Sequence, residues 1–100
     1  MRAYELLLIL NPTLNEEDRS TVMERINTLI KENGSEFDSV EEWGKRKLAY
    51  EINKLNDGDY VLYKFKAEPA NIAEIDRVLS ITDAVVRFII VRSDENNKDN

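Results

Sequence analysis

The chain is organised around one stretch, Trp43-Gly44-Lys45-Arg46-Lys47-Leu48-Ala49-Tyr50. This stretch follows an acidic run that ends at Glu41-Glu42, and it leads into the alternation Leu48, Tyr50, Ile52, which is typical of a strand. A glycine between an aromatic residue and three consecutive cations lets a strand bend and carry long basic side chains past the end of a sheet. We therefore expect a basic arm for phosphate contact. The alternative is a solvated hairpin whose cations protect a sheet edge from mispairing.

Before this stretch the sequence predicts a strand and a helix. The apolar run from Arg2 to Leu10 is too short for an ordinary helix and ends at Asn11-Pro12, so we expect a central strand. Asn15 precedes three acidic residues and should cap a helix. Asn33-Gly34 should end that helix with a left-handed residue. Its charged side, which includes Arg19, is expected to be solvated.

After this stretch the sequence predicts a turn, a strand, a helix and a strand. Asn56-Asp57-Gly58 is a turn pattern, and residues 59–67 alternate as the second strand of a hairpin. Pro69 is expected to open a shorter helix, and the β-branched run Val85–Val91 to form the last strand. Residues 94–100 are polar and predict a disordered tail, which leaves a single domain over residues 1–93.

The order strand, helix, strand, strand, helix, strand predicts an α+β fold. This is the ferredoxin-like split βαβ (βαββαβ) arrangement, with a four-stranded antiparallel sheet and both helices on one face. The other face of such a sheet is open, and an apolar cluster there favours a docking surface for another protein. The alternative is that these are exposed apolar residues without a function, as many surfaces have. The assignment of residues to this face also depends on the strand register, and a slip of one residue would move them to the opposite face. The residues expected on the open face are Leu7, Ile9, Tyr60, Leu62, Ile89 and Val91.

Composition argues against an enzyme. The chain has no cysteine and no histidine, which removes disulfides, thiol nucleophiles and thiolate or imidazole metal sites. The three glycines, at positions 34, 44 and 58, are too far apart to form a glycine-rich phosphate-binding loop. A phosphatase of this fold would need an anion-binding arginine in the loop after the first strand, and that loop contains no cation. We expect no catalytic residues, no cofactor and no metal. The longest apolar run, Leu6 to Leu10, is far below the roughly 20 residues that cross a bilayer, so we expect a cytoplasmic protein without a membrane segment.

The charge balance limits the ways in which this protein could bind nucleic acid. The formal net charge is −6, and phosphate binding depends on local Lys and Arg clusters acting against that general repulsion. Any role in nucleic-acid binding should therefore need a basic partner.

Three segments carry a resemblance to a known family: Met1-Arg2-Ala3-Tyr4-Glu5, Leu10-Asn11-Pro12, and Trp43 to Ile52 followed by Gly58-Asp59-Tyr60. Over about residues 1 to 93 the chain resembles the bacterial small-ribosomal-subunit protein S-six family, in which many members carry Pro where this chain has Glu51. The resemblance implies a structural component of the small ribosomal subunit that binds the central domain of 16S ribosomal RNA together with ribosomal protein S-eighteen, a small basic partner. The alternative is a free-standing ferredoxin-like module that binds RNA or a metabolite.

With this resemblance, two sets of site residues are expected. The apolar residues of the open face become candidates for the protein partner. The candidates for contact with RNA phosphates or with acidic groups of the partner are the cations Arg2, Lys45, Arg46, Lys47, Arg87 and Arg92.

Overall fold

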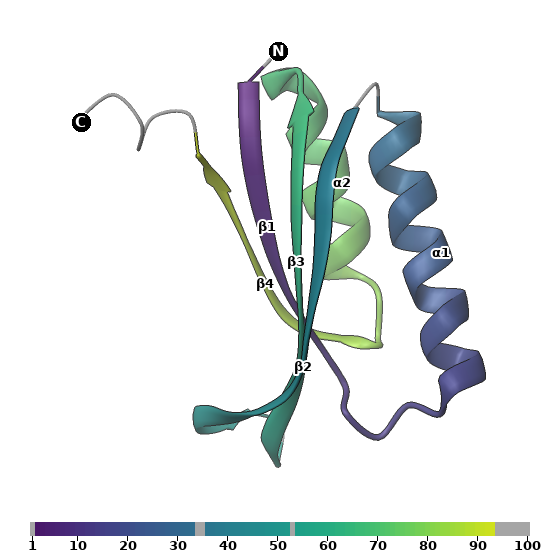
Figure 1. Ribbon diagram of the computed structural model, residues 1–100, viewed down its shortest axis with the longest axis vertical. Coiled ribbons are helices and arrows are strands. Elements are labelled where there is room, and N and C mark those ends of the chain that lie inside the picture. Colours follow the sequence, from purple (N-terminus) through teal and green to yellow (C-terminus); the bar gives the residue numbers. More distant parts are fainter. Residues whose placement is uncertain (1, 34–35, 53, 94–100) are drawn as a thin grey trace.

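The computed structural model of the protein describes residues 2–33, 36–52 and 54–93. Its elements are β1 (Arg2–Leu10), α1 (Glu16–Glu32), β2 (Glu36–Ile52), β3 (Leu55–Ala67), α2 (Pro69–Ser80) and β4 (Val85–Arg92). The strands form one antiparallel sheet in the order β2-β3-β1-β4, and both helices lie on the same face of it (Figure 1). The predicted ferredoxin-like arrangement is confirmed. The expected disordered tail, 94–100, lies outside the described residues.

The helices begin where the sequence predicts. Asn15 Oδ1 accepts a hydrogen bond of 2.8 Å from the backbone N–H of Asp18, which satisfies one of the free donors at the start of α1. Pro69 is the first residue of α2. At the end of α1, Asn33 has φ −93° and is not left-handed, and Gly34 lies outside the described residues. No helix in the described ranges has the length and apolar character needed to cross a membrane.

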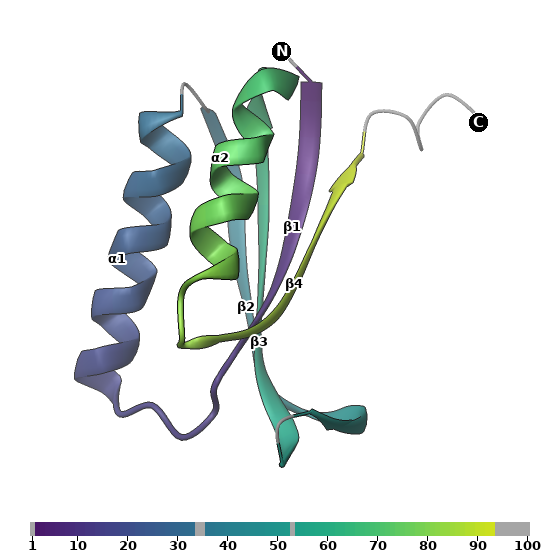
Figure 2. The same ribbon diagram turned by 180° about the vertical axis from the view of Figure 1, so that it is seen from behind.

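Both helices lie against one side of the sheet in the view from behind (Figure 2), and the buried side chains of the core lie between these two layers. β1 is hydrogen-bonded on both sides, to β3 and to β4, so it is an inner strand of the sheet, as the sequence predicts. Alternate residues of β1 and β3 point inward, and each helix adds one apolar stripe to them. The side chains that are fully buried include Leu6, Leu8, Leu10, Val61, Tyr63, Phe65, Ile30, Ile75 and Leu79.

The predicted position of the hairpin turn is wrong. β2 continues to Ile52 and β3 begins at Leu55, and these two residues face each other across the ladder. Lys54, with φ 67°, has the left-handed conformation of a tight turn, while Asn56, Asp57 and Gly58 lie within β3. Gly58 has a packing role instead. A Cβ atom there would clash with Cγ2 of Ile9 and lie 3.2 Å from Cδ2 of Leu48.

Candidate nucleic-acid interface and docking face

β2 bends at Gly44, as the sequence predicts. The β2–β3 register shifts between Glu42 and Gly44, and Gly44 has φ +80°, a conformation that other residues rarely adopt. Beyond the bend, β2 carries three exposed cations. We call residues 45–47 the basic arm. Figure 1 shows the end of the β2–β3 hairpin extending past the other two strands, so the arm is accessible from several sides.

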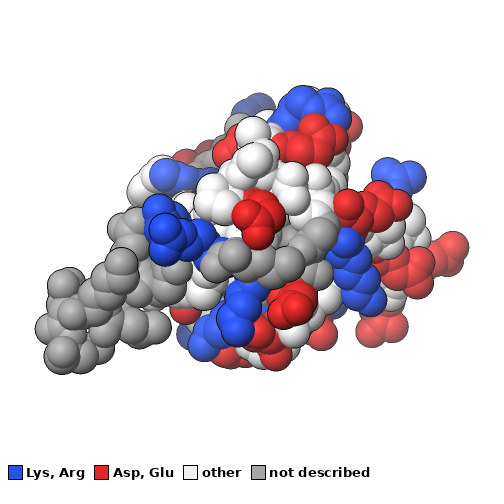
Figure 3. All heavy atoms as spheres, turned by 90° about the horizontal axis from the view of Figure 1, so that it is seen from above, with Lys and Arg blue, Asp and Glu red and all other residues white. Residues whose placement is uncertain are grey.

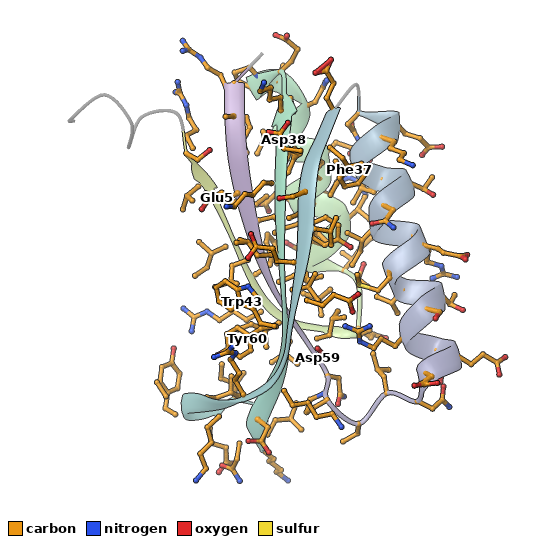
Figure 4. All side chains as sticks on the ribbon, viewed as in Figure 1. Glu5, Phe37, Asp38, Trp43, Asp59 and Tyr60 are labelled. Carbon is orange, nitrogen blue, oxygen red and sulfur yellow. The ribbon has the colours of Figure 1, made fainter. Side chains whose placement is uncertain are left out.

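Two aromatic rings support the arm. The rings of Trp43 and Tyr60 are stacked, with centroids 6.3 Å apart and planes at 10°, and the sticks in Figure 4 show them side by side. The guanidinium carbon of Arg46 lies 5.6 Å from the Trp43 ring centroid, which is within the range of a cation–π interaction. The indole N–H of Trp43 donates to Glu41 at 3.2 Å, and this bond lowers the pKa of the Glu41 carboxyl. The stack could not be predicted from the sequence because the alternation of β2 is broken around Trp43.

A second aromatic contact links the arm's hairpin to the far edge of the sheet. The guanidinium of Arg87, on β4, donates to the hydroxyl of Tyr50 and lies 6.0 Å from the centroid of its ring. Tyr50 belongs to the extended part of β2, so the hairpin reaches over the end of the open face. The strand register also places Arg87, opposite Ile9, at the same end of the sheet as the basic arm.

The six predicted cations do not form one patch. Arg2 begins β1, and Arg92 faces Tyr4, whereas Arg87 faces Ile9 near the end of β1. A strand rises about 3.3 Å per residue, so along the sheet Arg92 lies about 17 Å and Arg2 about 23 Å from Arg87. Figure 3 looks from above onto the end of the sheet where β1 begins and β4 ends, and positive and negative groups are intermingled on the part of that surface that is coloured. The arm is therefore the better candidate for phosphate contact.

An ion-pair network at the base of the arm was not predicted. Arg19, expected to be solvated, donates from Nε to Asp59 Oδ2 at 2.6 Å, and its terminal nitrogen lies 2.7 Å from Glu42 Oε1. Asp59 is only 6% exposed, and its hydrogen bond to Arg19 is the main reason that the pKa of Arg19 is raised. The network joins α1 to β3 and β2. Figure 4 shows Asp59 on the side of the sheet towards α1, opposite Trp43 and Tyr60. Forty positions separate Arg19 from Asp59, so no local pattern could have predicted it.

The predicted open face is confirmed by the register. Leu7 faces Leu62 on one side and Ile89 on the other, while Ile89 and Val91 are 47% and 42% exposed. A groove of about 230 Å³ lies on this face, and it is lined by Glu5, Leu7, Trp43, Leu62, Ile89 and Val91. Among the described residues, no cluster of three or more Asp, Glu, His or Cys could hold a metal ion.

Ile9 differs from the expectation for this face. Its position in the register is as predicted, but only 7% of it is exposed. Gly58 leaves room for the Ile9 side chain beside Leu48, so the hairpin covers it. Ile9 can therefore support the open face from below but offers little surface to a partner.

Comparisons with known proteins agree on one family. The family model described as ribosomal protein S6, the S-six family named above, matches residues 3–92. Small ribosomal subunit protein bS6 of Desulforamulus reducens is 48% identical over 95 residues, which are 95% of this chain and 100% of that protein. The protein of the same name from Thermoanaerobacter pseudethanolicus is 50% identical with the same coverage.

Solved structures agree with the family and the fold. The crystal structure of 30S ribosomal protein S6 from Thermotoga maritima superposes with a TM-score of 0.89 at 35% identity, covering 98% of this chain and 94% of that one. The C-terminal domain of the MgtC protein from Mycobacterium tuberculosis has a TM-score of 0.60 at 12% identity, a similarity of fold alone.

Proposed function

The chain belongs to the ribosomal protein S6 family, and on that basis we propose that it binds the central domain of 16S ribosomal RNA jointly with ribosomal protein S-eighteen. As a member of this family it is a structural protein of the small subunit of the bacterial ribosome and not an enzyme. The joint binding, the partner and the residues that make the contacts are the proposal.

The observation that carries the RNA half of the proposal is the state of the basic arm. Lys45, Arg46 and Lys47 are exposed, and none of them makes an ion pair with another described residue. Asp59, which faces Lys45 across the ladder, is bound by Arg19 instead. Three cations that lie on a projecting hairpin and have no counter-ion among the described residues are suited to phosphate oxygens. Arg87, which contacts Tyr50 of the same hairpin, is a further candidate, and Arg2 and Arg92 are candidates for a separate contact.

Charge also supports a joint role with a basic protein. The three cations of the arm act against a net charge of −6, which disfavours tight binding of RNA by this chain alone. A basic partner would supply the positive potential that this chain lacks. This chain would in turn order the partner and add a few phosphate contacts.

The open face supports the protein half of the proposal. Its half-buried or exposed residues Leu7, Leu62, Ile89 and Val91 surround one groove, with Tyr60 nearby. A cluster of apolar residues with a concave centre is typical of the core of a protein interface. We propose that this face binds S-eighteen, with Ile9 supporting it from below.

The RNA contact is tested by replacing Lys45, Arg46 and Lys47 with Ala and measuring binding of the reconstituted protein pair to 16S central-domain RNA. The matched control changes Arg25, Lys31 and Arg77, exposed cations of the two helices, and removes the same charge. We expect only the arm variant to bind more weakly. The slope of log affinity against log salt should also become less steep, by about 0.9 for each duplex phosphate that the arm no longer neutralises. Affinity and slope equal to those of the control variant would mean that the arm only guards the sheet edge.

The protein contact is tested by Leu62→Asp or Ile89→Asp. Either change places a charge on the open face and should weaken association with purified S-eighteen while the free domain still folds. Ile81→Asp, at a position 68% exposed beside the helices, is the matched control and should not affect pairing. Normal pairing of the open-face variants would refute this assignment.

A further inference from the structure

The groove on the open face contains a single carboxylate. Five of its six lining residues are apolar or aromatic, and the sixth is Glu5, on the central strand β1. Glu5 faces Val91 on one side, and Figure 4 shows it on the open side of the sheet above Trp43. Within the groove, the side chains around this carboxylate are therefore apolar or aromatic.

Glu5 has no hydrogen bond or ion pair with any described residue, although its side chain is half-buried. The nearest cation across the ladder is Lys64, but the Lys64 ammonium lies 3.4 Å from Glu41 Oε2. Placing a carboxylate in apolar surroundings without a partner costs free energy. No described residue satisfies this carboxylate, and on that basis its partner should come from another molecule.

We infer that the groove receives an arginine or lysine side chain of the protein partner, with its apolar stem against Leu7, Leu62 and Ile89 and its cation on Glu5. This inference rests on the proposed docking face and identifies its central contact. Long cationic side chains bury their methylene stems on apolar surface while their charged ends reach a polar group. The groove, at about 230 Å³, is several times the roughly 30 Å³ that one water occupies in the liquid, so it holds most of a side chain.

Charge decides between the possible occupants of the groove. Glu5 would repel the phosphates of RNA. A purely apolar side chain in the groove would exclude water from the Glu5 carboxylate and leave it buried without a hydrogen-bond partner, which costs free energy. A cation satisfies Glu5 and matches a basic partner of a protein with net charge −6. Glu5 thereby selects a basic protein surface and separates the open face from the RNA-binding arm.

The inference is tested with Glu5→Gln, which keeps the shape of the side chain and removes its charge. Association with purified S-eighteen is measured by titration calorimetry, and Glu24→Gln, at an exposed position of α1, removes the same charge far from the groove. We expect about a tenfold or greater loss of affinity for Glu5→Gln, as for the loss of a charge-assisted bond, and none for Glu24→Gln. Each Arg and Lys of S-eighteen is then changed to Gln in turn. One of these changes should weaken binding to the wild-type protein but not to the Glu5→Gln variant.

Three results separate this inference from the proposal on which it rests. If Leu62→Asp abolishes pairing but Glu5→Gln binds like the wild type, the docking face stands and the cation pocket is wrong. If neither variant affects pairing, the docking face itself is wrong. If Glu5→Gln lowers the thermal stability of the isolated domain and leaves the affinity unchanged, Glu5 serves Lys64 within the free protein, and the inference is again overturned.

Discussion

The Arg19–Asp59 pair gives the strongest stability prediction. In Arg19→Met the helix keeps an unbranched apolar stem, but the Asp59 carboxylate, 6% exposed, loses the donor that lies 2.6 Å from it. Removing one partner of a fully buried pair costs about 3–5 kcal/mol, and exposed pairs contribute about 1 kcal/mol or less. The Arg19 side chain is 26% exposed, so screening by water reduces the effect. We expect a loss of about 2–3 kcal/mol in the free energy of unfolding.

The measurement is urea unfolding of Arg19→Met, Asp59→Asn and the double variant. Because Asp59→Asn removes the unpaired charge, the double variant should be more stable than the sum of the single losses predicts, by about 1–2 kcal/mol. Arg77→Met is the control, since the Arg77–Glu74 pair has a similar distance of 2.7 Å but lies in solvent on α2. A loss for Arg19→Met no greater than that for Arg77→Met, or strict additivity in the double variant, would refute the reasoning.

Three further predictions concern pH and glycines. Burial raises the pKa of Tyr63 from 10.0 to about 12. As the pH rises, Tyr63 therefore ionises in the unfolded chain before it ionises in the folded protein. The stabilisation from this group is present below pH 10 and is lost towards pH 12. Between pH 10 and pH 12, urea unfolding should show a loss of stability that is about 2 kcal/mol smaller in Tyr63→Phe than in the wild type. The exposed Tyr50→Phe is the control, and an equal loss in Tyr63→Phe and the wild type would contradict the assignment. Gly58→Ala should lower the free energy of unfolding by about 1–3 kcal/mol in the same assay, because the new methyl group clashes with Ile9. Wild-type stability would mean that the side chains around Gly58 can move to make room for it. Gly44 has φ +80°, and no atom lies within 4 Å of an added Cβ. Gly44→Ala should therefore lower the free energy of unfolding by about 1–2 kcal/mol, the cost of the left-handed conformation alone. A larger decrease would contradict the open space around this position.

Local patterns in the sequence were sufficient to predict the element order and the face assignment. The apolar run of β1, the Asn15 cap and Pro69 each act within a few residues, and the structure keeps all three. The bend at Gly44 followed from one glycine between an aromatic residue and three cations. The alternation of β3 determined the two faces of the sheet, because side chains alternate strictly along a strand.

The errors involve residues far apart in the sequence. Arg19 was expected in solvent because its helical position is polar, and only the fold brings Asp59 to it. The pattern Asn56-Asp57-Gly58 predicted a turn, but Gly58 is needed where Ile9 and Leu48 pack against the backbone. The same packing buries Ile9. The Trp43–Tyr60 stack was not predicted because a bulge changes the side to which β2 residues point.

Binding to 16S central-domain RNA, measured at one salt concentration with and without S-eighteen, tests the central claim most directly. The claim is that this acidic protein binds RNA tightly only together with a basic protein. The basic arm contacts the RNA, and the apolar groove that contains Glu5 contacts the basic protein. This claim predicts weak binding by the isolated chain and tight binding by the pair, with the tight binding reduced both by the arm variant and by Leu62→Asp. Tight binding by the chain alone, unchanged when S-eighteen is added, would contradict it and favour a free-standing RNA-binding module.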